Sequence, residues 1–329
     1  MLCACSRSTA LIPEHRIIGR PVPLPDDAAL NYSSLYLNET EQCIVKTEFL
    51  GDIVLKKIYY EADSVANVFR RGRGPNEYPF LWLQQIDGQG NLYAKSQTGG
   101  QLLKFSPACE LLETLPISPD AIKSVAVGDR FVSYGGERTM YRLWSADGKQ
   151  NIEFGNFPDD GVSCENRYKT YAYQGKLLAN ERLGRFAFLC SYADILDIYE
   201  IGDEGAPTKV FSKREHFPSY TPQKDVIGVR YRDLVIRYSD AYATDRSIYA
   251  LYSGKPTNGG RTEAGIRNAQ ESDRIEVYDW DGAHRCDLLL DRPILDFCVG
   301  SDDGFLIALY SDEGEMRFCR YDLAGIGIR

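Results

Sequence analysis

The chain has 329 residues, with 38 Lys and Arg against 47 Asp and Glu, giving a formal net charge of −9. This acidic balance argues against a nucleic-acid partner, because proteins that bind nucleic acid usually present a basic domain or stripe. The hydrophobic fraction of 43% is that of a globular protein and excludes a disordered or fibrous chain. A chain of this length can bury enough surface to fold without a disulfide or a metal.

The N-terminal residues resemble a bacterial lipobox. Leu2-Cys3-Ala4-Cys5 has a Leu, two small residues and then the Cys that such a motif acylates. No basic or apolar segment precedes it, so we expect the sequence to start too late, without the apolar part of a signal peptide. A chance match in a cytosolic protein is the alternative. We predict that residues 1–15 form a tether lipidated on Cys5, which anchors the protein without spanning the membrane.

Short alternating strands separated by turns recur along the chain, whereas long helical patterns are missing. Each of these strands is followed by a second strand that carries an aromatic residue. The first strands are Ile44–Phe49, Asn91–Ala94, Arg130–Tyr134, Lys176–Ala179, Ser247–Tyr252 and Gly304–Tyr310, and the aromatics are Tyr59, Phe105, Trp144, Tyr199, Tyr278 and Tyr321.

An all-strand repeat of about 40–55 residues indicates a β-propeller, in which each repeat forms one four-stranded blade. Six repeats predict an all-β, six-bladed β-propeller that forms a single domain over residues 16–329. Tyr321 lies so close to the C-terminus that the last blade lacks an outer strand, and we expect Arg16–Leu24 to supply it and close the ring. A β-sandwich, or two small β domains, is the alternative.

The longest interval between the aromatic residues contains the polar, Gly-rich segment Gly254–Gly265. We interpret it as an inserted surface loop, since long loops in compact domains are often functional or disordered. The insertion, taken as Gly254–Ser272, is one candidate element of a functional rim.

A second candidate is the glycine-rich run Phe69–Tyr78, which reads FRRGRGPNEY. Gly72 and Gly74 permit tight backbone geometry, Pro75 fixes φ, and Glu77 can accept backbone N–H bonds within the loop. A dinucleotide fingerprint is excluded because a helix should follow it, and a proline and an aromatic strand follow instead. We therefore interpret the run mainly as a structural turn.

The same run carries three arginines within four positions. Such a cluster can bind carboxylate, phosphate or sulfate groups, although a solvated charged loop explains it equally simply. The candidate binding residues of this rim loop are Arg70, Arg71, Arg73, Asn76 and Glu77.

These motifs resemble a recurrent signature of the TolB-like six-bladed β-propeller lipoproteins of Gram-negative bacteria. In that family a Gly-x-Gly-Pro-x-Glu-aromatic run follows the outer strand of the first blade, an Asp-Trp-Asp/Asn-Gly-like turn precedes the last blade, and an acylated Cys begins the mature chain. The residues that fill these places are Gly72, Gly74, Pro75, Glu77, Tyr78, Asp279, Trp280, Asp281, Gly282 and Cys5. The resemblance covers nearly the whole chain from about residue 16. It implies a structural role for the motif residues and a location in the cell envelope, but no assigned activity, and the missing signal peptide departs from the family pattern.

Catalytic motifs are lacking. There is no Gly-x-Ser-x-Gly elbow and no Ser-x-x-Lys. His216 and His284 are expected at the surface, and His15 precedes the first strand. Three acidic pairs look like turns, so we expect no metal site. Calcium at the central channel is the alternative, because oxygen ligands suit this ion. The pairs are Asp26-Asp27, Asp159-Asp160 and Asp302-Asp303.

Cysteine and tyrosine usage points to packing. None of the nine Cys forms a CxxC pair, and Cys190, Cys298 and Cys319 lie in apolar runs typical of small core residues. Several of the 22 Tyr lie near turns, where they suit packing between blades or the face of a carbohydrate or peptide. These are Tyr168, Tyr171, Tyr173, Tyr220, Tyr231 and Tyr238.

We predict a non-catalytic binding or scaffold propeller in the cell envelope, anchored only by the lipid on Cys5. Its protein or glycan partner would bind one rim or the channel mouth. One alternative is a hydrolase or lyase that acts on glycans or lactones with channel-mouth carboxylates and calcium. Three or more converging acidic side chains at that mouth would favour this enzyme. Another alternative is a cytosolic interaction propeller.

Overall fold

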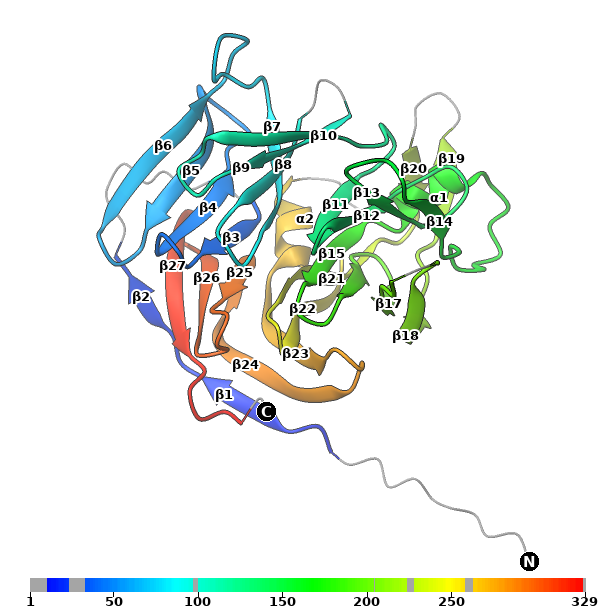
Figure 1. The fold of residues 1–329 in the computed structure, drawn as a ribbon. Coiled ribbons are helices and arrows are strands. Elements are labelled where there is room, and N and C mark those ends of the chain that lie inside the picture. Colours follow the sequence, from blue (N-terminus) through cyan, green and yellow to red (C-terminus); the bar gives the residue numbers. More distant parts are fainter. Residues whose placement is uncertain are drawn as a thin grey trace, which may run out of the picture.

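The computed structural model describes residues 11–23, 33–96, 100–203, 205–223, 228–257 and 263–327. Most of their strands form six largely antiparallel sheets set as blades around a central axis (Figure 1). The innermost strand of each blade contacts that of the next, and the last contacts the first, so the ring is closed. The predicted all-β, six-bladed propeller is confirmed.

The first three blades each use four consecutive strands. They consist of β3 (Leu35–Asn38), β4 (Cys43–Thr47), β5 (Ile53–Tyr59) and β6 (Ser64–Arg70), of β7 (Leu81–Ile86), β8 (Leu92–Ser96), β9 (Gln101–Phe105) and β10 (Leu111–Pro116), and of β11 (Lys123–Val127), β12 (Arg130–Tyr134), β13 (Tyr141–Ser145) and β14 (Asn151–Phe154).

The last three blades carry the insertions. The fourth has β15 (Gly175–Asn180), β16 (Arg185–Cys190), β17 (Asp194–Glu200) and β18 (Thr208–Glu215), the fifth has β21 (Val235–Ala243), β22 (Ser247–Pro256), β23 (Ser272–Asp279) and β24 (His284–Ile294), and the sixth has β25 (Asp296–Val299), β26 (Phe305–Asp312) and β27 (Glu315–Asp322). Between them lie α1 (Asn166–Ala172), the hairpin of β19 (Tyr220–Gln223) and β20 (Gly228–Tyr231), and α2 (Glu263–Gln270).

The N-terminal segment closes the ring, as predicted. Strand β2 (Arg20–Val22) pairs antiparallel with β27 and completes the sixth blade. Strand β1 (Glu14–Ile17), which begins within the predicted tether, instead pairs parallel with β24 and adds a fifth strand to the neighbouring blade. Gly19 joins the two strands so tightly that a Cβ there would lie 2.2 Å from the Cys319 sulfur. One short segment thus ties the last two blades together.

The predicted alignment of the fourth repeat is wrong, because it is displaced by one strand. Lys176–Ala179 belongs to the innermost strand β15, whereas the other five predicted segments belong to second strands. The equivalent second strand is β16, whose run Phe186–Cys190 is fully buried and continuously apolar. A strand buried on both faces loses the polar–apolar alternation on which the alignment relied.

The predicted surface loop Gly254–Gly265 is also corrected. Strand β22 extends through Pro256, and α2 begins at Glu263, so the insertion starts later and contains a helix. Residues 258–262 lie outside the described part. No helix of the described chain is long and apolar enough to cross a membrane.

The core lies between neighbouring blades. Tyr134 of the third blade stacks on Phe188 of the fourth, with ring centroids 4.6 Å apart, and Tyr238 packs in a cluster with Ala187 and Leu189 across the next boundary. The other tyrosines singled out in the sequence lie in or against the cluster of the third and fourth blades. Cys190, Cys298 and Cys319 are buried as predicted, and the seven described cysteines are free thiols.

Candidate functional site

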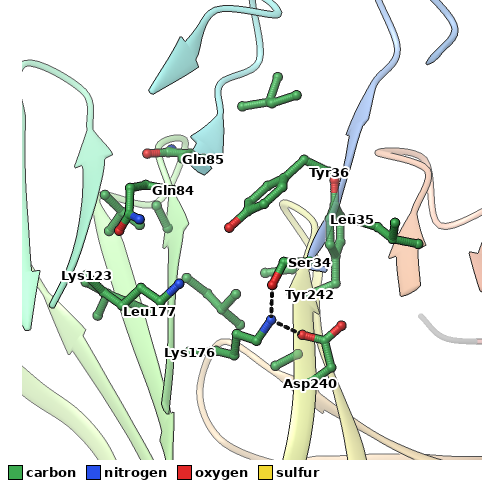
Figure 2. Close-up of a pocket in the computed structure, with 16 residues that line it drawn as sticks. Ser34, Leu35, Tyr36, Gln84, Gln85, Lys123, Lys176, Leu177, Asp240 and Tyr242 are labelled. Carbon is green, nitrogen blue, oxygen red and sulfur yellow. Dashed lines mark hydrogen bonds and ion pairs between the residues drawn. The ribbon is translucent and has the colours of Figure 1, made fainter. Parts of the chain in front are cut away.

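The central channel encloses a polar cavity of about 100 Å³ (Figure 2). Its lining includes residues at the beginnings of inner strands, such as Lys123, and at their ends, such as Ile86 and Ala243. The mouth at which the inner strands begin is here called the first mouth. The inner strands of five blades line it. Their polar side chains include Tyr36, Gln84, Lys123, Lys176 and Asp240.

Lys176 and Asp240 form the central ion pair of this cavity. The Lys176 ammonium contacts the Asp240 carboxylate and also donates a hydrogen bond of 2.9 Å to the Ser34 hydroxyl (Figure 2). The second Asp240 oxygen accepts a 3.3 Å bond from the backbone N–H of Phe297. Because Asp240 is only 2% exposed, the pair lies largely out of water and each charge depends on the other.

A second carboxyl group, that of Asp296, lies beside this pair. One of its oxygens accepts a 2.9 Å hydrogen bond from the backbone N–H of Leu35. Burial, followed by the negative charge of Asp240, raises the pKa of Asp296 well above its ordinary value, although Lys176 opposes the shift. Asp296 therefore favours its neutral form, and the two carboxyl groups share roughly one negative charge.

Lys123 has a different environment from Lys176. Its ammonium lies 4.7 Å from the centre of the Trp82 ring, and among the described residues no carboxylate pairs with it. Burial, and then the positive charge of Lys176, lowers the pKa of Lys123 to about 7. A lysine with a strongly shifted pKa in a cavity marks a candidate functional site.

The neighbouring amide and phenol groups hold the channel wall in place. The Gln84 side-chain oxygen accepts the Ser124 N–H at 3.1 Å, and the Gln85 amide bonds both the N–H and the C=O of Ala126. The Tyr36 hydroxyl donates to the Leu83 carbonyl at 2.9 Å. These bonds fix β7 against β3 and β11, which gives the cavity a rigid wall.

A larger cavity of about 550 Å³ lies at the opposite mouth, where the inner strands end. Four acidic side chains line it, and three of them bind neighbours: Glu39 accepts the Ser301 N–H, Asp87 accepts the Asn91 N–H, and Asp245 pairs with Arg182. The fourth is Glu181. No three His, Cys, Asp or Glu side chains of the described chain gather closely enough to hold a metal ion. The acidic residues are thus spread around the mouth and do not converge.

The run Phe69–Tyr78 joins the first two blades: Phe69 and Arg70 end the outer strand β6, and the loop follows from Arg71. The Arg71 guanidinium donates to three backbone carbonyls, those of Gly51, Pro79 and Glu48, at 2.8, 2.6 and 3.0 Å. Arg71 therefore joins this loop to the β4–β5 turn. Its donors point at the protein and not at solvent.

The rest of the motif is built around Glu77. Its carboxylate accepts the Gly74 N–H at 2.9 Å, and a Cβ on Gly72 would lie 1.9 Å from the same oxygen. Asn76 has a φ of 57° in the left-handed region. Pro75 is exposed and Tyr78 packs edge-on against Phe69, while Arg70 and Arg73 are exposed.

Exposed apolar side chains adjoin this loop. Phe49, Leu50 and Trp82 are 43%, 76% and 37% exposed. Phe80 packs against Phe49 with ring centroids 5.6 Å apart, and Arg71 lies over the Phe80 ring. We call these four residues, Phe49, Leu50, Phe80 and Trp82, the rim patch. Through Trp82 and Lys123 the patch reaches the channel cavity.

The second family motif forms a joint between the fourth and fifth blades. The buried Trp280 indole donates to the Thr244 carbonyl at 2.9 Å, and Asp281 pairs with Arg185 of the fourth blade. Gly282 has a φ of 87°, and a Cβ there would lie 2.1 Å from the Phe211 ring. These contacts hold the fourth and fifth blades together.

Other candidate residues are engaged in local contacts. His216 has a side chain 61% exposed and pairs with Asp194 at 2.6 Å. His284, predicted at the surface, is instead 21% exposed, because it stacks on Tyr278 and bonds Asp287. Asp160 binds Lys169, Tyr173 and Tyr220, and Asp303 binds Thr244 and Tyr249. Cys5 and Asp26-Asp27 lie outside the described residues.

The channel residues were not singled out in the sequence. Lys123, Lys176 and Asp296 are each the single charge of their inner strand, and Asp240 shares its strand with Arg237. That pattern is a usable signal, since a lone charge in a buried strand must be paired or functional.

A family model and a solved structure agree with this architecture. The family model described as TolB-like 6-blade propeller-like matches residues 39–302. The crystal structure of a DUF4221 family member from Bacteroides vulgatus ATCC 8482 has 10% sequence identity, with 92% of this chain and 96% of that chain covered and a TM-score of 0.58. Chaetomium thermophilum Raptor has 11% identity and a TM-score of 0.49, with 94% of this chain but 29% of Raptor covered. No curated protein matches the sequence.

The structural likeness is one of fold alone, because the identities are low. The family match is different in kind, since it covers most of the chain and includes both motifs described above. The chain therefore belongs to the TolB-like six-bladed propeller family.

Proposed function

We propose that this protein is a non-catalytic binding propeller that captures a protein partner on the rim patch. The observation that carries the proposal is the exposure of Phe49, Leu50 and Trp82 at one rim. Grouped exposed apolar side chains are unusual on a monomer and typically mark an interaction surface.

The chemistry of the patch favours a protein over a glycan. Glycans stack on flat aromatic rings, whereas Leu50, the most exposed member at 76%, offers an aliphatic surface that suits apolar side chains. Trp and Arg are the residues most enriched at energetic centres of protein interfaces. The exposed Arg70 and Arg73 flank the patch and favour carboxylates on the partner.

We further propose that a lipid on Cys5 holds the propeller at the cell envelope. The lipobox-like run Leu2–Cys5 supports this location. The anchor test is expression with the in-frame DNA upstream of Met1. Wild type should partition with membranes and Cys5→Ser should become soluble, whereas equal partition of the two would contradict the anchor.

The patch is tested by partner capture with matched variants. Wild type should retain a protein partner that Leu50→Asp and Trp82→Ala lose. Leu112→Asp is the control, because Leu112 is also exposed, at 54%, but lies on the outer strand β10. A partner bound equally by all four proteins would overturn the patch as the site, and capture of a glycan alone would overturn the partner class.

The hydrolase alternative gains no comparable support. The described channel holds two carboxyl groups, and one of them is paired with Lys176. The acidic residues of the opposite mouth do not converge.

A further inference from the structure

The channel cavity contains more positive than negative charge. Lys176 is compensated by Asp240, and Asp296 favours its neutral form because of burial and the nearby Asp240. Lys123 remains without a carboxylate among the described residues. Lys95, on β8, adds a further positive charge near Lys123, and its own ammonium donates to the Ala121 carbonyl.

An uncompensated ammonium out of water is costly. Burial disfavours the charged form, and like charges disfavour it further. Trp82 offers its ring face to Lys123 at 4.7 Å, but such a contact supplies far less than a carboxylate partner does. When Lys123 is protonated, the site therefore lacks about one negative charge, which a bound monoanion would supply.

The cavity sets the size and nature of that anion. Its volume is about 100 Å³, somewhat below the roughly 150 Å³ that holds one benzene molecule. Apolar side chains, including Leu35, Val125 and Leu177, share the wall with the polar groups. Small-molecule sites typically combine apolar wall with placed polar groups, and this cavity has both.

We propose that the channel cavity binds a small aliphatic carboxylate whose anionic group pairs with the Lys123 ammonium. The site shares Trp82 with the rim patch, but its binding residue, Lys123, is not part of that patch, so the two proposals are tested by different variants. The Trp82 ring lies against the Lys123 ammonium, and the aliphatic part of the ligand packs against the leucine and valine side chains that line the cavity. Lys123 is the binding residue, while Lys176 and Asp240 position the wall.

The proposal implies a definite pH dependence. Only the protonated form of Lys123 pairs with the ligand, and burial lowers the pKa of Lys123 to about 7. The protonated fraction falls from about 0.9 at pH 6 to about 0.03 at pH 8.5, so the apparent affinity should fall about 30-fold. Other groups that face Lys123 are Lys95, Lys176, Asp240 and Asp296.

The test is ligand-observed NMR with sodium propionate and the full chain. Wild type should bind propionate saturably at pH 6 and about 30-fold more weakly at pH 8.5. Lys123→Met should weaken binding by about 10- to 100-fold at pH 6, the range for loss of a charged hydrogen bond. Lys123→Arg should still bind, with most of the pH dependence gone, because arginine stays protonated.

Two controls keep the proposal open to refutation. Lys209→Met removes a lysine that also lies over an aromatic ring, that of Tyr199 at 5.6 Å, but outside the cavity, and it should bind propionate like wild type. Circular dichroism melts confirm that each variant is folded. Absence of propionate binding, binding unchanged in folded Lys123→Met, or an undiminished pH dependence in Lys123→Arg would overturn the proposal. Binding of inorganic phosphate but not propionate would overturn the ligand class.

Discussion

Replacement of Lys176 by Met tests whether the channel charges depend on one another. Methionine keeps the apolar stem but removes the ammonium that compensates Asp240, which is only 2% exposed. The Asp240 carboxylate would keep the 3.3 Å bond from the Phe297 N–H. Its neighbour Asp296 is a second carboxyl group and cannot compensate its charge.

The expected cost is about 3 kcal/mol of unfolding free energy. Removing one partner of a buried ion pair typically costs about 3–5 kcal/mol, because the other charge stays buried and unpaired. The low end applies here, since the Lys176 side chain is 20% exposed and water can reach part of the site. A loss of this size is a substantial share of the roughly 5–15 kcal/mol that stabilises a folded protein.

The assay is urea unfolding at pH 7.5, followed by tryptophan fluorescence and by far-ultraviolet circular dichroism. The double variant Lys176→Met/Asp240→Asn should recover most of the loss, because asparagine removes the orphaned charge and keeps an acceptor for the Phe297 N–H. A Lys176→Met cost below about 1 kcal/mol, or a double variant no more stable than the single one, would refute the reasoning.

Three further predictions use the same denaturation assay. Asp296→Asn, which keeps an acceptor for the Leu35 N–H, should flatten the pH profile. Wild type loses stability as pH rises from about 4 toward the raised pKa of Asp296, because in this range Asp296 holds a proton in the folded state that it lacks in the unfolded state. A pH profile of Asp296→Asn identical to that of wild type would argue against the raised pKa. Lys123→Met should stabilise the protein most below pH 7 and progressively less toward pH 10, because the folded state of wild type holds fewer protons in that window. Equal free energies of unfolding for wild type and Lys123→Met at pH 6 would contradict this. Gly72→Ala should cost about 1 kcal/mol by displacing Glu77 from the Gly74 N–H, whereas Gly88→Ala, with open space around it, should cost less; equal costs would speak against the Glu77 contact.

The fold was largely predictable because each blade repeats the same local signals. In the blades a second strand and an aromatic third strand recur. The few residues after Tyr321 showed that the sixth blade needed an outer strand from elsewhere, and β2 supplies it. The fourth blade was misaligned because β16 is apolar on both faces. Strand β1 was missed because nothing in four residues indicates parallel pairing with a strand some 270 positions away.

The channel site was not predictable from spacing. Lys123, Lys176 and Asp240 lie on three different blades, and only closure of the ring brings them to one cavity. Lys123 and Lys176 were visible as single charges in their strands and Asp240 as one of two, but the sequence does not tell which of these charges meet. The rim patch was missed for a related reason, since Phe49 and Trp82 read as ordinary strand residues until the neighbouring loops leave them exposed.

The most direct test of the channel account is the pKa of Lys123, measured by NMR on protein with labelled lysine side chains. Lys123→Arg identifies the signal. The account predicts a pKa near 7 without ligand and a clear upward shift when propionate is added, because a bound carboxylate favours the ammonium. A pKa near the ordinary value of about 10.4 that does not respond to propionate would contradict it.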